Sequence, residues 1–114
     1  MKRIGLLGGM SWESSIEYER LINHEVRRRL GGTHSGDLVI RSYDFAAIEE
    51  LQERGAWDEA GQLLADDAVH LENAGAAAVL EASVELLVGP EHVRCPYFPT
   101  THLHAMRAVD LALA

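Results

Sequence analysis

The residues that could bind a ligand or take part in a reaction cluster in short loops. The first such loop, Gly8-Gly9-Met10-Ser11, follows an apolar run and precedes a helical pattern. Glycines let a backbone approach a ligand closely, and the amides at a helix N-terminus favour a carboxylate or phosphate. The turn therefore predicts an anion-binding cradle. The alternative is that Gly8 and Gly9 only make the turn, and the local sequence does not decide between the two.

Hydroxyls and carboxylates stand at the other predicted strand ends. Tyr43 is the last residue of the second predicted strand, and Glu81 and Glu85 flank the end of the third. The two glutamates are candidates for a general acid or base, with a solvated helix start as the alternative. Thr100 and Thr101 are placed either to bind a substrate carboxylate or to cap the helix that follows, and capping is the ordinary role of threonine there.

The sequence lacks the motifs that several other chemistries require. The glycine turn matches neither the dinucleotide fingerprint nor the Walker loop, and no Gly-x-Ser-x-Gly motif supports a serine hydrolase. His102 and His104 are two residues apart and so point about 200° from each other on a helix, which does not allow them to chelate one metal. Cys95 lies at the start or middle of a predicted strand and is interpreted as incidental. No metal and no cofactor are predicted.

Composition narrows the function classes further. The chain has 114 residues, of which 47% are hydrophobic and 25% charged, and its net charge is −8. This balance fits one globular domain and argues against a nucleic-acid partner. The dense basic run, Arg27-Arg28-Arg29, is expected to be at a helix C-terminus, where cations oppose the dipole. A single cysteine fits a reducing, cytoplasmic compartment, and no apolar run of roughly 18 residues predicts a membrane span.

The elements that must position these loops alternate between strands and helices. Strands are predicted over residues 3–7, 37–43, 76–80 and 93–98. Pro96 confines the last strand to an edge or irregular position. Helices are predicted to start at Ser11, Asp44, Asp58 and Thr100 or Thr101, with a turn or two over residues 84–88.

The apolar spacing of these helices indicates which side chains face the core. The expected inward set comprises Ile16, Leu21, Ile22, Val26, Leu30, Phe45, Ile48, Leu51, Leu63, Leu64, Ala68 and Leu71. The alternation predicts an α/β fold: a single three-layer domain with a four-stranded parallel sheet and helices on both faces. In such sheets ligands bind outside the carboxyl ends of the strands.

Four segments taken together resemble the aspartate/glutamate racemase family. They are Ile4-Gly-Leu-Leu-Gly-Gly-Met-Ser-Trp-Glu-Ser-Ser, Tyr18-x-x-Leu-Ile-Asn23, Leu30-Gly-Gly-x-His34-Ser35 and Trp57-Asp-Glu-Ala-Gly61. Residues 1–78 are similar to the family's N-terminal half, and residues 79–114 to its C-terminal end, so that 1–114 is expected to be one racemase-like domain. About half of the family's length has no counterpart.

The resemblance implies cofactor-independent amino-acid racemisation, in which one cysteine from each of two facing halves moves the α-proton. Both cysteine motifs would fall near Glu81-Ala82-Ser83, where there is no thiol, so we expect no activity. The substrate-binding set carried over is Met10, Ser11, Tyr43, Thr100 and Thr101. It implies a small amino acid or dicarboxylate anion as ligand.

The length suggests a shortened or engineered domain that forms a homodimer, since half of a face-to-face pair exposes an apolar surface. The alternative is a non-catalytic folding or oligomerisation module.

Overall fold

The computed structural model describes residues 1–9, 12–81, 94, 97–99 and 102–114. The elements, in chain order, are β1 (Arg3–Gly8), α1 (Trp12–Leu30), β2 (Leu38–Ser42), α2 (Phe45–Glu53), α3 (Trp57–Asn73), β3 (Ala76–Glu81), β4 (Tyr97–Pro99) and α4 (His102–Leu113). The predicted helical turns at 84–88 lie outside these residues. Within the described ranges, no helix combines the length and apolar character that a bilayer span requires.

The strands form a parallel sheet in the order β2-β1-β3-β4, which confirms the α/β class. In the central register, Leu7 of β1 lies between Arg41 of β2 and Glu81 of β3. The body of the sheet has three strands of five or six residues, whereas β4 has only three. The prediction of a four-stranded sheet was therefore wrong in extent, because only three strands are of full length. Of the predicted strand over 93–98, Tyr97 and Phe98 belong to the short strand β4, whereas Arg94 lies outside any strand. Pro99, which has no N–H for the ladder, ends β4.

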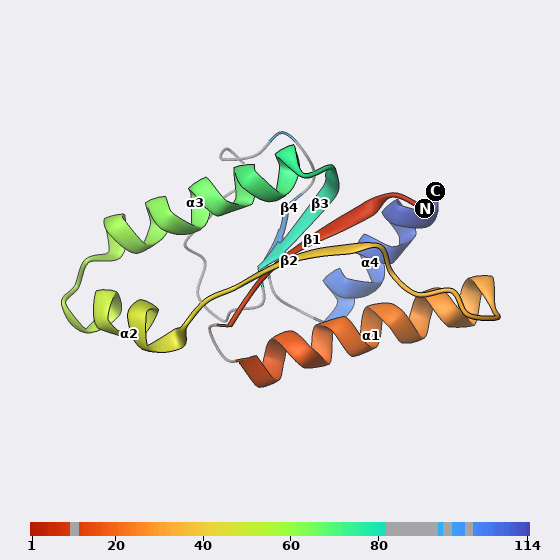
Figure 1. Ribbon diagram of the computed structural model, residues 1–114, viewed down its shortest axis with the longest axis horizontal. Helices are drawn as coiled ribbons and strands as arrows, with labels where there is room; N and C mark the ends of the chain where they lie inside the picture. The colour runs from red at the N-terminus through yellow and green to blue at the C-terminus, as the bar shows by residue number, and fades with distance from the viewer. Residues whose placement is uncertain (10–11, 82–93, 95–96, 100–101) are drawn as a thin grey trace.

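Helices cover both faces of the sheet, as predicted (Figure 1). The helices α2 and α3 pack on one face and α1 and α4 on the other. Side chains of β1 alternate between the faces, so Leu7 joins the α2/α3 side while Ile4 and Leu6 join the α1/α4 side. The chain termini lie next to each other (Figure 1), and the Lys2 N–H donates to the Ala112 carbonyl at 2.9 Å.

Among the helix ends that the structure describes, the sequence signals hold with one exception; the predicted starts at Ser11 and at Thr100 or Thr101 lie outside the described residues. Asp44 caps α2, its Oδ1 accepting from the Ala46 N–H at 3.1 Å, and Gly31 and Gly32 follow α1 with φ of 74° and 59°. Asp58 was predicted to open the third helix, but it lies in the first turn of α3, after an Ala56 N-cap without a side-chain bond. An acidic residue is favourable in that turn as well, so the sequence signal does not separate the two positions.

The inward set was partly wrong. Ile22, Val26, Ile48, Leu64, Ala68 and Leu71 are buried as predicted, whereas Ile16, Leu30, Phe45 and Leu63 are exposed and Leu21 and Leu51 are partly exposed. Ile16 precedes the buried Ile22 by six residues, which places it about 240° away around the helix and off the packed stripe. Leu63 is likewise about 100° from the buried Leu64.

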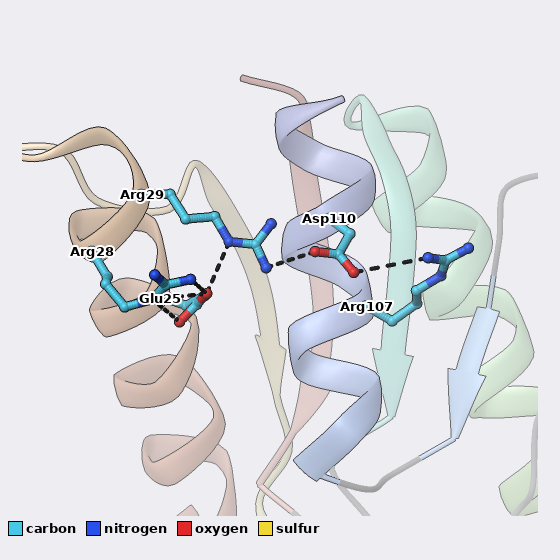
Figure 2. Close-up of polar contacts among 5 residues, drawn as sticks. All are labelled: Glu25, Arg28, Arg29, Arg107 and Asp110. Atoms are coloured by element: carbon cyan, nitrogen blue, oxygen red, sulfur yellow. Dashed lines mark hydrogen bonds and ion pairs between the residues drawn. The ribbon is translucent and has the colours of Figure 1, made fainter.

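The basic run is at the C-terminal end of α1, as predicted, and it also joins α1 to α4. Figure 2 shows Glu25 accepting from Arg28 and Arg29, with nitrogen–oxygen distances of 2.6 and 2.9 Å. Arg29 also pairs with Asp110 of α4 at 2.6 Å. The ionic contacts therefore connect the C-terminal end of α1 to α4.

Candidate functional site

The carboxyl ends of β1 and β2 meet at the predicted glycine turn. The Tyr43 N–H donates to the Gly8 carbonyl at 3.0 Å, and Gly9 follows with φ of 86°. A Cβ on Gly9 would lie 2.3 Å from both the backbone nitrogen and the carbonyl oxygen of Tyr43, and 2.8 Å from the Ser42 Oγ. Only glycine can occupy this position without moving the backbone of the neighbouring strand.

The turn is also packed against α1 through Ser15. The Gly9 N–H donates to the buried Ser15 Oγ at 2.8 Å, and a Cβ on Gly8 would come within 2.4 Å of the same oxygen. The Gly9 amide is thus used inside the fold and does not face a ligand. Amide donors for an anion at this turn would come from Met10 and Ser11, which lie outside the described residues.

Tyr43 lies at the same edge, but its polar group is engaged. The ring is buried among Leu7, Ile48 and Leu64, and the hydroxyl donates to the Asp67 Oδ2 at 2.6 Å. Burial raises the pKa of Tyr43 far above its ordinary value, and the hydrogen bond to Asp67 and the charge of Asp67 raise it further. Tyr43 therefore stays a neutral phenol. Because the Tyr43 O–H donates its hydrogen bond to Asp67, the phenol oxygen can only accept a hydrogen bond from a ligand.

Asp67 of α3 contacts three polar side chains on this face of the sheet: Tyr43, Arg41 and His70. Its Oδ2 is 3.3 Å from the Arg41 Nε, and its Oδ1 is 3.1 Å from the His70 Nδ1. Burial alone would raise the pKa of Asp67, but hydrogen bonds with Tyr43 and His70 and the charge of Arg41 outweigh it, so the pKa is lowered. The Arg41 guanidinium lies 4.3 Å over the Tyr43 ring.

Neither Arg41 nor Asp67 was among the predicted site residues. The two-residue spacing of Arg41 and Tyr43 on a strand places both on one face, and this signal was available in the sequence. Nothing local marks Asp67, which reaches Tyr43 across 24 residues of chain.

Glu81, a candidate acid or base, is the last residue of β3 and is fully buried. The alternative of a solvated helix start is therefore wrong for this residue. Glu81 and Arg41 both pair with Leu7 in the sheet, so their side chains are on the same face. Tyr43, two residues after Arg41, is on that face as well. In addition to burial and Asp67, the charge of Glu81 raises the pKa of Tyr43.

The remaining predicted residues, Met10, Ser11, Glu85, Thr100 and Thr101, lie outside the described residues. Among the residues that the structure describes, no three histidine, cysteine, aspartate or glutamate side chains gather in a way that could hold a metal ion.

Two solved structures share this fold. A proposed Asp/Glu racemase from Yersinia pestis matches 98% of the chain at 38% identity, with a TM-score of 0.70. An aspartate racemase homologue from Pyrococcus horikoshii OT3 matches 85% of the chain at 26% identity, also with a TM-score of 0.70. The chain spans less than half of each, 42% and 44% of their lengths. No protein-family model matches the chain. The predicted resemblance to the aspartate/glutamate racemase family is confirmed.

Proposed function

We propose that this chain, a racemase-like domain related to the aspartate/glutamate racemases, binds a small amino acid or dicarboxylate anion at the carboxyl ends of β1 and β2. The observation that carries the proposal is the contact of Gly9 with the backbone of Tyr43. It holds the ends of β1 and β2 together, and the hydrogen bond from Gly9 to Ser15 adds the first turn of α1, at the edge where open α/β sheets bind ligands. Met10 and Ser11 are the proposed donors to a ligand carboxylate, with Thr100 and Thr101 as further contacts.

We further propose that the domain does not racemise its ligand. A two-thiol mechanism needs a cysteine on each face of the α-carbon, and the only cysteine in this sequence is Cys95. Ala82, which follows the buried Glu81, has no ionisable group that could transfer a proton. The proposed organisation is one domain in which residues 79–114 complete residues 1–78, a shortened member of the family, natural or engineered, that pairs as a homodimer in the cytoplasm.

Binding and catalysis are separated by one NMR experiment. D- and L-aspartate and D- and L-glutamate are titrated into the labelled protein while the amides of Gly9, Met10 and Ser11 are followed. In deuterated buffer, the loss of the ligand's α-proton signal measures exchange. Saturable shifts without α-exchange are the expected result. Exchange faster than in a protein-free sample would refute the inactivity.

The competing candidate is a folding or oligomerisation module without a ligand. One specific observation favours it: the contacts of Gly8 and Gly9 with Ser15 and Tyr43 account for both glycines through packing alone. The absence of shifts at millimolar ligand in the same titration would support this module over the binding site. Light scattering at high protein concentration tests the homodimer, and a monomer mass would count against it.

A further inference from the structure

We propose that one exposed side of α1 is the surface through which two copies of this chain pair, with the two helices antiparallel and a two-fold axis at Asn23. The inference rests on the homodimer of the proposed function and deepens it by naming the interface. It does not involve the ligand, so the pairing and the ligand binding can be tested separately.

The surface is a row of five side chains whose spacing is the same in both directions from its centre. Asn23 is the centre, Glu19 and Arg27 are four residues before and after it, and Ile16 and Leu30 are seven residues before and after it. Residues separated by four and by seven positions lie on one side of an α-helix. We call these five residues the outward stripe.

The outward stripe lies away from the contacts that α1 makes within the chain. Figure 2 shows Glu25 on the side of α1 that faces α4, and Asn23, two residues earlier, is about 200° from it around the helix. Ile16 and Leu30, at the two ends of the stripe, are 54% and 45% exposed. Trp12, one turn before Ile16, is 60% exposed and enlarges the apolar end. Both ends of the stripe therefore offer apolar surface to a partner.

The charges of the outward stripe have no counter-ions within the described chain. Arg28 and Arg29 pair with Glu25, whereas the exposed Glu19 and Arg27 form no ion pair with any residue that the structure describes. Glu19 and Arg27 are eight residues apart, about 12 Å along the helix, which is too far for them to pair with each other. A second copy of α1 would bring both of them a charge of opposite sign.

The order of residue types selects the antiparallel arrangement. About an axis at Asn23, Ile16 faces Leu30 of the second copy and Glu19 faces Arg27 of the second copy, and each contact occurs twice. A two-fold interface requires this reciprocity. A parallel pairing would instead set Glu19 against Glu19 and Arg27 against Arg27, which is repulsive. The stripe is thus complementary to itself in one orientation.

Asn23 is suited to the axis. Its Oδ1 accepts from the Gly36 N–H at 2.8 Å, which holds the side-chain amide in place. Its NH2 group has no acceptor among the described residues, and its oxygen has a second lone pair. Two such amides that meet on the axis can exchange hydrogen bonds. An asparagine at a helix–helix contact fixes the register of the pair at some cost in stability.

The alternative is that this side of α1 is an ordinary solvated surface, which leaves the chain monomeric. Sedimentation equilibrium of the 114-residue protein, at up to about 1 mM, measures the Kd of a dimer held by one helix per subunit. Glu19→Arg turns two attractive contacts into two repulsive ones. Since one exposed ion pair changes Kd about twofold, the Kd should rise about 16-fold.

The exchange of the two charges is the decisive variant. Glu19→Arg combined with Arg27→Glu restores opposite charges across the axis and should return the Kd to within about threefold of the wild type. Glu17→Arg is the matched control, because it makes the same change of charge about 200° from Glu19 around α1. Its Kd should stay within about twofold of the wild type.

A cross-link locates the axis. Only a residue on the axis meets its own counterpart, so Asn23→Cys in a Cys95→Ser background should give a disulfide-linked dimer under mild oxidation, whereas Glu17→Cys should not. Circular dichroism confirms that each variant is folded. If Asn23→Cys does not fold, because the bond to Gly36 is lost, the charge exchange decides.

The possible failures are distinguishable. A wild type that is monomeric at every concentration overturns both this inference and the proposed homodimer, and leaves the ligand titration to decide the binding function. A dimer whose Kd is unchanged in Glu19→Arg overturns the α1 interface and leaves the homodimer standing. A Kd that rises in Glu19→Arg and is not restored by the charge exchange overturns the antiparallel pairing.

Discussion

Replacing Tyr43 with phenylalanine tests whether the polar cluster around Asp67 holds β2 and α3 together. The substitution removes one hydroxyl and keeps a ring that is 7% exposed and packed on Leu7, Ile48 and Leu64. The only described hydrogen bond lost is the donation to Asp67 at 2.6 Å. Asp67 keeps its contacts with Arg41 and His70, so its carboxylate is not left without partners.

The expected cost follows from the type of bond. A hydrogen bond to a charged acceptor contributes about 1.5–3 kcal/mol to the free energy of unfolding. Because Asp67 keeps its other partners, we expect Tyr43→Phe to lower this free energy by about 2 kcal/mol. For a domain of this size that is a fall in Tm of about 8 °C. Urea unfolding followed by circular dichroism measures the free energy directly. The control is Tyr18→Phe, at a half-buried ring on the other face, with an expected cost of about 0.5 kcal/mol.

The pH dependence has a definite sign. The pKa of Asp67 is lowered in the folded protein, so its stabilisation is fully present above the unfolded value of about 4 and is lost as the pH falls through the folded value. The hydrogen bond from Tyr43 is one cause of that lowering. The difference between wild type and Tyr43→Phe should therefore be largest at neutral pH and should shrink as the pH falls below about 4. A difference that is constant with pH, or equal to that of Tyr18→Phe, would refute this account.

Three further predictions follow from single positions. Gly9→Ala should lower the free energy of unfolding in urea by about 3 kcal/mol or more, because a Cβ there collides with backbone atoms. Gly55→Ala, at φ of 69° with open space around it, should lower it by about 1 kcal/mol. Similar losses in the two variants would contradict the close contact at Gly9. Asp44→Ala removes the α2 cap and should cost about 1 kcal/mol, and Asp44→Asn, which keeps the acceptor, should cost less than half of that. Hydrogen bonds from Arg28 and Arg29 lower the pKa of Glu25 to about 2, so its stabilisation should persist until the pH falls well below 4; NMR titration should show the pKa rising in Arg29→Ala and unchanged in Arg54→Ala.

The sequence-based predictions were most accurate where a local rule decides the structure. The cap at Asp44, the glycines after α1 and the small apolar run of β3 depend on neighbours a few residues away, and the structure has all three. The buried stripe of α1 was partly correct. Ile16 is exposed because it lies off the packed side of the helix, and Leu30 is exposed in the last turn.

The candidate site was harder to predict because its contacts join distant parts of the chain. Ser15 holds the Gly9 amide, and Asp67 holds the Tyr43 hydroxyl across 24 residues, and neither partner is marked by a motif. The prediction that the turn's amides face an anion could not allow for an internal acceptor six residues ahead. Glu81 illustrates the same limit, since a glutamate at a strand end usually meets water but is buried here.

The last helix explains why the glycine turn should be studied in the whole chain. Ala105, Ala108 and Ala112 recur on one side of α4, and their small size lets the helix approach the sheet closely. With Val109 they cover Ile4, Leu6 and Leu80, together with Ile22 and Val26 of α1. Without α4, fully buried side chains of both central strands would lose their cover, and β1 carries the turn. A ligand titration on residues 1–78 alone would therefore measure the loss of the core before it measured the site.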